Sequence, residues 1–278
     1  MQSRNPVFKN SPAFNGRGGY ATSDAPAGTA TATDLEQIYA APSATGAQTG
    51  RMTMDDVVMK TGILFVVLLT TAAISYFAIT PKMTAAPIIA MVVGLGMGLF
   101  ISFKQSTNAA LIITYAAVEG VFVGGISYFY QSYVDYGSTT GNAPNIVAQA
   151  VLGTLAAFVG MLVLYRSGKL RATPKFTKGL LIAGFGYLAV ALVSFVSSFF
   201  GTGDGWGFYG VGGLGILLCV GGVALASLFL ILDFDFIERA VKAGAPRETA
   251  WLAGFGLMVT LVWLYLEILR LLAILNRR

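Results

Sequence analysis

Seven long apolar segments dominate the chain after residue 60. They cover residues 62–80, 87–103, 108–130, 146–165, 179–200, 209–232 and 250–275. Each is close to the ~20 residues that a helix needs to cross ~30 Å of hydrocarbon, and none has the strict alternation typical of a strand. Because a bilayer core offers no water to pair with the backbone, the pattern predicts seven transmembrane helices.

The first fifty residues have a different pattern. Ala, Gly, Ser, Thr and Pro predominate in residues 1–50, and no apolar run interrupts them. Such a segment buries too little apolar surface to offset the entropy of ordering it. We therefore expect residues 1–50 to form a disordered cytoplasmic tail and residues 51–278 to form one seven-helix domain, an all-α membrane protein.

The composition supports this fold class and narrows the function. The chain is 55% hydrophobic and 11% charged, whereas soluble domains have about 25% charged residues. It has no histidine, and Cys219 is its one cysteine. The lack of histidine excludes histidine-based metalloproteases, Ser–His hydrolases and histidine pH switches. We expect a protein that is not an enzyme and that needs no cofactor.

The net charge of +5 does not indicate binding to nucleic acid, because Lys and Arg lie between the apolar segments. Five of them lie in residues 166–178, and none lies in 131–145 or 201–208. Since basic loops stay on the cytoplasmic side, we expect a cytoplasmic N-terminus in the plasma (inner) membrane. Seven crossings would place the C-terminus outside, although the chain ends in two arginines; alternatively, the last segment does not fully cross.

Few ionisable residues lie within or at the edge of the apolar segments. They are Lys104, Glu119, Asp233, Glu267 and Arg270. Such a group at mid-bilayer costs about 2.5–3.5 kcal/mol on insertion scales and often marks an ion or proton path. Glu119 suits either an internal hydrogen bond or a pore-lining role. Glu267 suits either such a path or a local salt bridge with Arg270, three residues later on the same helical face.

Two other polar stretches are better explained by structure than by function. Asp235, Glu238, Arg239 and Lys242 alternate in sign and predict a solvated helix end. The stretch "GTGDG" at 201–205 contains the Gly-x-Gly-Asp of intramembrane aspartyl proteases. That chemistry needs two aspartates that share a proton, and no neighbouring segment offers the second one. We therefore expect a turn here, and an intramembrane hydrolase is disfavoured.

Three motifs together resemble the Bax inhibitor-1 family (transmembrane Bax inhibitor motif). "LILDFDFIERA" places Asp233 four residues before Ile237, and "LVWLYLEILRLLAIL" places Glu267 at the acidic position of the family's final helix. "AAVEGVFVGGI" is similar to the family's third helix. The long tail and "MTMDDVVMKTGIL" resemble a bacterial branch of this family. The resemblance covers about residues 60–278.

The resemblance implies six helices wrapped around a central C-terminal helix. It also implies a pH-sensitive calcium leak that is closed by two acids, here Asp233 and Glu267, which would also be the calcium ligands. Lys104 would be the counter-ion of Asp233 in the other state. The chain departs from the family pattern in having Glu at 267 and Lys at 104, and in the longer stretch between the acids.

Elementary electrostatics supplies a mechanism for such a pair. Two carboxylates close together in a low dielectric cannot both ionise cheaply, so at low pH they would share a proton and hold the path shut. Carboxylate oxygens also suit Ca²⁺. We therefore expect a pH-gated calcium channel whose partners are the bilayer, calcium and protons. The alternative is a non-transporting regulator that binds other membrane proteins, such as a protease or a stress-response component.

Overall fold

The computed structural model describes residues 50–137, 144–168, 170–201, 207–210 and 212–277. All but the last residue of the predicted tail, and the predicted turn at Asp204, lie outside these ranges. The elements are α3 (Met54–Ile74) with the π-helical turn η1 (Ser75–Ile79), α4 (Ala86–Lys104), α5 (Ala109–Gly137), α6 (Ile146–Arg166), α7 (Pro174–Ser198), the 3₁₀ turn η2 (Gly207–Tyr209), α8 (Gly213–Lys242) and α9 (Thr249–Asn276).

Seven of these helices are long and apolar enough to cross a membrane, with α3 and η1 forming one span. They coincide with the seven predicted segments, and the described residues form no strand beyond one isolated bridge between Arg51 and Pro246. The predicted all-α fold with seven spans is confirmed.

Three helices extend seven or more residues beyond their apolar segments, and α3 does so at its start, at Met54 instead of residue 62. The sixth apolar segment ends at residue 232, but α8 continues to Lys242. Its last turns carry the ion pairs Asp235–Arg239 and Glu238–Lys242, which support a helix outside the hydrocarbon. The helix α5 likewise continues seven residues beyond its apolar segment, which ends at residue 130, to Gly137. Hydropathy marks where the membrane ends, and a helix can continue beyond that point into water.

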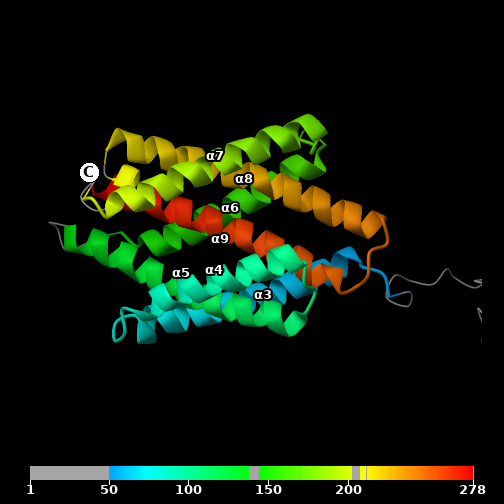
Figure 1. The fold of residues 1–278 in the computed structure, drawn as a ribbon, viewed down its shortest axis with the longest axis horizontal. Helices are drawn as coiled ribbons and strands as arrows, with labels where there is room; N and C mark the ends of the chain where they lie inside the picture. Colours follow the sequence, from blue (N-terminus) through cyan, green and yellow to red (C-terminus); the bar gives the residue numbers. More distant parts are fainter. Residues whose placement is uncertain (1–49, 138–143, 169, 202–206, 211, 278) are drawn as a thin grey trace, which may run out of the picture. The chain divides into compact units, whose positions relative to one another are not determined.

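The last helix, α9, lies at the centre of the bundle. In Figure 1 it runs between α3, α4 and α5 on one side and α6, α7 and α8 on the other. Fifteen of its 28 residues are buried, compared with two of the 25 residues of α7. Four helices pack directly on α9, namely α3, α5, α6 and α8. The helix α4 packs on α5, and α7 packs on α8 and η2, so these two form the outer parts of the bundle.

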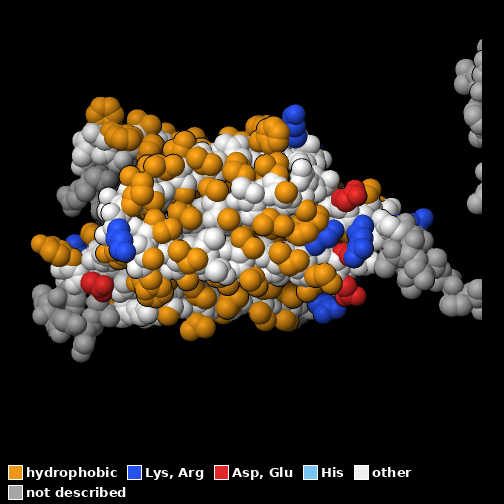
Figure 2. Space-filling model, turned by 90° about the horizontal axis from the view of Figure 1, so that it is seen from below, with side chains coloured by type: hydrophobic (Ala, Val, Ile, Leu, Met, Phe, Trp, Pro, Cys, Tyr) orange, Lys and Arg blue, Asp and Glu red, His pale blue; other side chains and the backbone are white. Residues whose placement is uncertain are grey.

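Charged side chains gather at the two ends of the bundle. We call the end where α3, α5, α7 and α9 begin the basic end; the described part of it includes Arg51, Arg171, Lys175 and Arg247. The opposite end, called the distal end, has Lys82 and Arg277 in its described part. Figure 2 shows hydrophobic side chains over the length between these ends, as expected of a surface that faces lipid.

The C-terminal helix crosses the whole bundle. The guanidinium carbon of Arg277 lies 4.1 Å from the ring centroid of Tyr133, near the end of α5. Since α5 also ends at the distal end, the last described residue lies at the end opposite to the start of α3. The last segment is therefore long enough to cross, and it spans the bundle from end to end.

Candidate functional site

The candidate acids lie along the antiparallel interface of α8 and α9, where each faces a glycine of the other helix. A Cβ atom at Gly222 of α8 would lie 2.7 Å from the carboxyl carbon of Glu267. A Cβ atom at Gly256 of α9 would lie 4.0 Å from Oδ1 of Asp233. Glu267 therefore faces Gly222, and Asp233 faces Gly256.

Glu267 is enclosed, with only 5% of its surface exposed. Its Oε1 atom accepts hydrogen bonds from the Tyr187 hydroxyl of α7 at 2.8 Å and from the Trp263 indole N–H at 3.2 Å. Its Oε2 atom is buried and has no hydrogen-bond partner. A buried polar atom without a partner is costly, and a proton or a cation bound there would relieve that cost.

Asp233 has a similar but separate environment. Thr260 of α9 interacts with its carboxyl group. The Thr260 hydroxyl also donates to the Gly256 carbonyl, one turn earlier, at 3.2 Å. The Oδ2 atom of Asp233 is buried and, like Oε2 of Glu267, has no hydrogen-bond partner. The interface thus holds two carboxyl groups, each with one oxygen available for a proton or a cation.

The two acids do not meet, so the predicted pair that shares one proton is not formed. Glu267 faces Gly222 of α8, and Gly222 is eleven residues from Asp233 on that helix. At 1.5 Å per residue the two carboxyl groups are about 16 Å apart along the interface. A calcium site that joins them is therefore not formed either, and the described residues contain no group of three or more His, Cys, Asp or Glu side chains placed to hold a metal.

The structure does not bring Lys104 to Asp233. Lys104 ends α4, is exposed, and has its ammonium 5.1 Å from the ring centroid of Phe100. The helix α4 packs on α5 and not on α8. The predicted counter-ion contact is absent from this arrangement because a whole helix, α5, separates α4 from the central helix.

Arg270 does not form the local salt bridge that the sequence allows. Its Nε atom donates to the Tyr130 hydroxyl of α5 at 2.9 Å, and its guanidinium lies 4.5 Å from the ring centroid of Tyr209. Among the described residues the ion pairs are elsewhere, and none includes Glu267. Tyr209 lies in η2, outside the spans, where burial raises its pKa, so a neutral ring faces the guanidinium.

Glu119 lies in another interface, between α5 and α4. Its Oε2 atom would lie 3.1 Å from a Cβ atom at Gly94 of α4, and Tyr115, one turn earlier on α5, interacts with its carboxyl group. Glu119 therefore lies at the α4–α5 interface and not at the α8–α9 interface.

Sequence reasoning missed the partners of these acids and one further buried acid. Tyr187 and Gly222 come from helices remote in sequence, and no local pattern marks them. Asp56 is 6% exposed and pairs with Arg247 through a 2.7 Å contact from Nε to Oδ1. A local signal was available here, because Thr53 and Asp56 form a reciprocal capping box at the start of α3.

Comparison with known proteins identifies the family. The sequence profile described as "Bax inhibitor 1 like" matches residues 5–277. This match begins near the start of the predicted tail, whereas the resemblance in the motifs begins at about residue 60. No individual curated protein matches the chain. Members of this family are membrane proteins and not enzymes, which agrees with the seven spans. The chain belongs to the Bax inhibitor 1 like family of multi-pass membrane proteins.

Proposed function

We propose that the chain is a pH-sensitive calcium leak in which Asp233 and Glu267 are two separate proton-sensitive sites. The observation that carries this proposal is that each acid is held between α8 and α9 with one buried carboxylate oxygen that lacks a partner. An ionisable group inside a membrane bundle is costly to place and usually belongs to an ion or proton path.

The spacing of the acids suits an ion path with two separate binding positions. Asp233 lies nine residues from the end of α8 at Lys242, and Glu267 lies nine residues from the end of α9 at Asn276. Asp233 is thus about 14 Å from the basic end of the bundle, Glu267 is about 14 Å from the distal end, and about 16 Å separates the two acids. Conduction requires sites that bind weakly enough to release the ion. One carboxylate supplies few of the six to eight oxygens that Ca²⁺ prefers, so each binding position would hold the ion only briefly.

The described arrangement agrees with a closed path. One groove lies between α4 and α5 and another lies among α3, α5, α6 and α9; neither is lined by Asp233 or Glu267. With both acids neutral, the glycine contacts can hold α8 against α9. Loss of a proton leaves a charge that must gain water or a cation, which favours separation of the two helices. Calcium flux should therefore rise as pH rises.

Flux through purified protein in liposomes tests this proposal. We expect Ca²⁺ flux to rise between pH 5.5 and pH 8, and Glu267→Gln to remove part of that rise because it keeps the shape but removes the titration. Asp233→Asn should remove another part. Since the two acids are more than ~10 Å apart, their effects on log flux should add, whereas a proton-sharing pair would give a double variant little different from either single one.

The control variant is Asp55→Asn, which removes an exposed acid from the first turn of α3. It should leave the pH profile unchanged. Pure protein that conducts no Ca²⁺ at any pH would refute the leak and favour the regulator that acts by binding other membrane proteins. Flux with an unaltered pH profile in the double variant would refute the assignment of these two acids.

A further inference from the structure

The helix α5 extends well beyond its neighbour α4 at the distal end. Close contacts fix how the two helices align: a Cβ atom at Gly98 would lie 3.2 Å from the Tyr115 ring, and one at Gly125 would overlap Pro87. Pro87 is the second residue of α4, so α4 begins opposite Gly125. Twelve further residues of α5 follow Gly125. They extend about 18 Å, and the last seven of them lie beyond the apolar segment that ends at residue 130.

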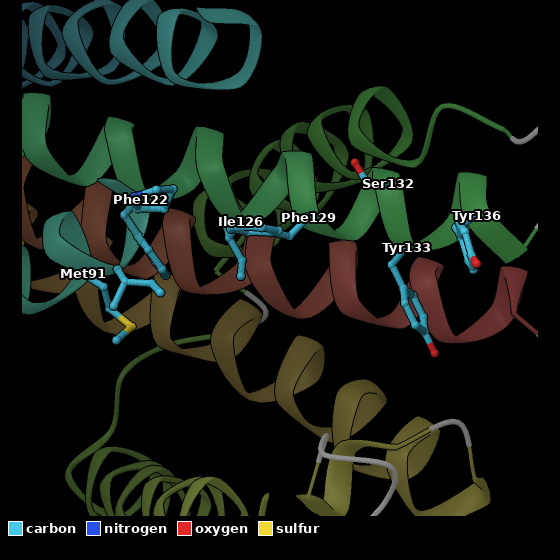
Figure 3. Close-up of a pocket in the computed structure, with 9 residues that line it drawn as sticks. Met91, Phe122, Ile126, Phe129, Ser132, Tyr133 and Tyr136 are labelled. Atoms are coloured by element: carbon cyan, nitrogen blue, oxygen red, sulfur yellow. The ribbon is translucent and has the colours of Figure 1, made fainter. Parts of the chain in front are cut away.

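An apolar groove of about 630 Å³ lies beside the first residues of α4, where α5 continues without α4 packed against it. Its α5 wall includes Ser132 and five aromatic or aliphatic residues that recur every three or four positions and so share one face of the helix: Phe122, Ile126, Phe129, Tyr133 and Tyr136. Figure 3 shows these side chains in order along α5, with Met91 of α4 beside the Phe122 end and Tyr136 at the other end. From Phe122 to residue 130, where the apolar segment ends, the α5 wall is about 12 Å long, most of one leaflet of the ~30 Å hydrocarbon core.

The outer end of the groove is polar and has a guanidinium beside it. Tyr133 and Tyr136 occupy the last turns of α5, the position that amphipathic aromatic rings prefer at a membrane surface. The guanidinium of Arg277 lies 4.1 Å from the Tyr133 ring centroid, and a Cβ atom at Gly137 would overlap it. Lys82 lies in the turn five residues before Pro87. Of the two basic residues in the described part of the distal end, Arg277 contacts a residue that lines this groove, Tyr133.

We propose that this groove binds one anionic phospholipid. An acyl chain would lie along the Phe122–Phe129 wall, and the phosphate would lie against Arg277 and the phenol groups of Tyr133 and Tyr136. The apolar wall of the groove covers most of one leaflet, which suits a lipid chain that enters from its own headgroup layer. The charge at the outer end selects an anionic headgroup. This inference is independent of calcium transport.

Native mass spectrometry of the full chain in detergent tests the site. Phosphatidylglycerol should bind about fivefold more tightly than phosphatidylcholine with the same acyl chains, which is the effect of one basic residue near a lipid surface. Arg277→Gln should abolish that preference, and Arg277→Lys should retain most of it. Met91→Trp, which fills the groove at a position 40% exposed, should weaken the binding of both lipids.

A matched control is Lys175→Gln, which removes one exposed positive charge at the basic end and should leave the preference intact. The melting temperature in phosphatidylcholine alone should be similar for Arg277→Gln and the unaltered chain, which separates lipid binding from the packing of Arg277 on the end of α5. Equal binding of the two lipids would overturn the proposal. So would a preference that survives Arg277→Gln, or one that Lys175→Gln reduces as much.

Discussion

At the scale of single residues, the burial of Glu267 depends on a glycine in the facing helix. The carboxyl group of Glu267 occupies the space that a side chain at Gly222 would need. This contact also leaves the Glu267 Oε1 atom within reach of Tyr187 and Trp263. A small residue is therefore required at position 222, and the reason for it lies in α9.

Gly222→Ala should lower the free energy of unfolding by about 1–3 kcal/mol, the usual cost of overpacking. The measurement is unfolding in mixed detergent micelles. Gly221→Ala is the matched control, because a Cβ atom at Gly221 has nothing within 4 Å; it should be neutral or slightly stabilising, since Ala is the better helix former. Equal stability of the two variants would contradict the proposed contact.

At the scale of elements, the start of α3 is tied to the turn between α8 and α9. The Met52 amide donates to the Ala245 carbonyl at 2.8 Å, and the Arg247 amide donates to the Gly50 carbonyl at 3.0 Å. Lys60 also donates from its ammonium to the Arg247 carbonyl at 2.6 Å. These bonds, with the Asp56–Arg247 pair, hold the first span against the last hairpin at the basic end.

Arg247→Gln should destabilise the protein by about 1–3 kcal/mol, because it leaves the buried Asp56 carboxylate without its cationic partner. Adding Asp56→Asn should restore part of the loss by removing the buried charge. The control is Arg239→Gln, which breaks an exposed pair in α8 and should change stability by no more than about 0.5 kcal/mol. A loss of the same size in the control would show that burial of Asp56 has no energetic role.

At the scale of the whole molecule, the seven crossings and the charge distribution together predict an orientation. We expect the basic end in the cytoplasm, because Arg171, Lys175 and Arg247 lie there and the described distal end has only Lys82 and Arg277. The chain enters α3 at the basic end and leaves α9 at the distal end.

A reporter joined after the last residue should therefore be outside, and one inserted near Arg171 should be inside. Paired fusions of alkaline phosphatase and a fluorescent protein at these two positions measure this. Two fusions on the same side would mean that one of the seven helices does not cross. Opposite sides with the reversed assignment would mean that the basic loops do not set the orientation.

The number of spans and the rarity of buried acids could be determined from the sequence by itself. Both follow from local properties: the length of an apolar run decides whether a helix can cross the bilayer, and a carboxyl group within such a run is exceptional wherever it points. Glu267, in the middle of an aliphatic stretch, is buried as its neighbours indicate. The solvated end of α8 was also readable from its alternating charges.

Which groups face one another was decided only by the tertiary structure, because facing depends on where a hairpin turns. For Asp233 to face Glu267, the chain would have to turn about residue 250, their midpoint, which lies inside α9. The actual turn is at 243–248, after the polar extension of α8 that hydropathy did not include. That turn sets Glu267 against Gly222. The partner from α7, Tyr187, is 80 residues away in sequence and becomes a neighbour only when the outer helix packs.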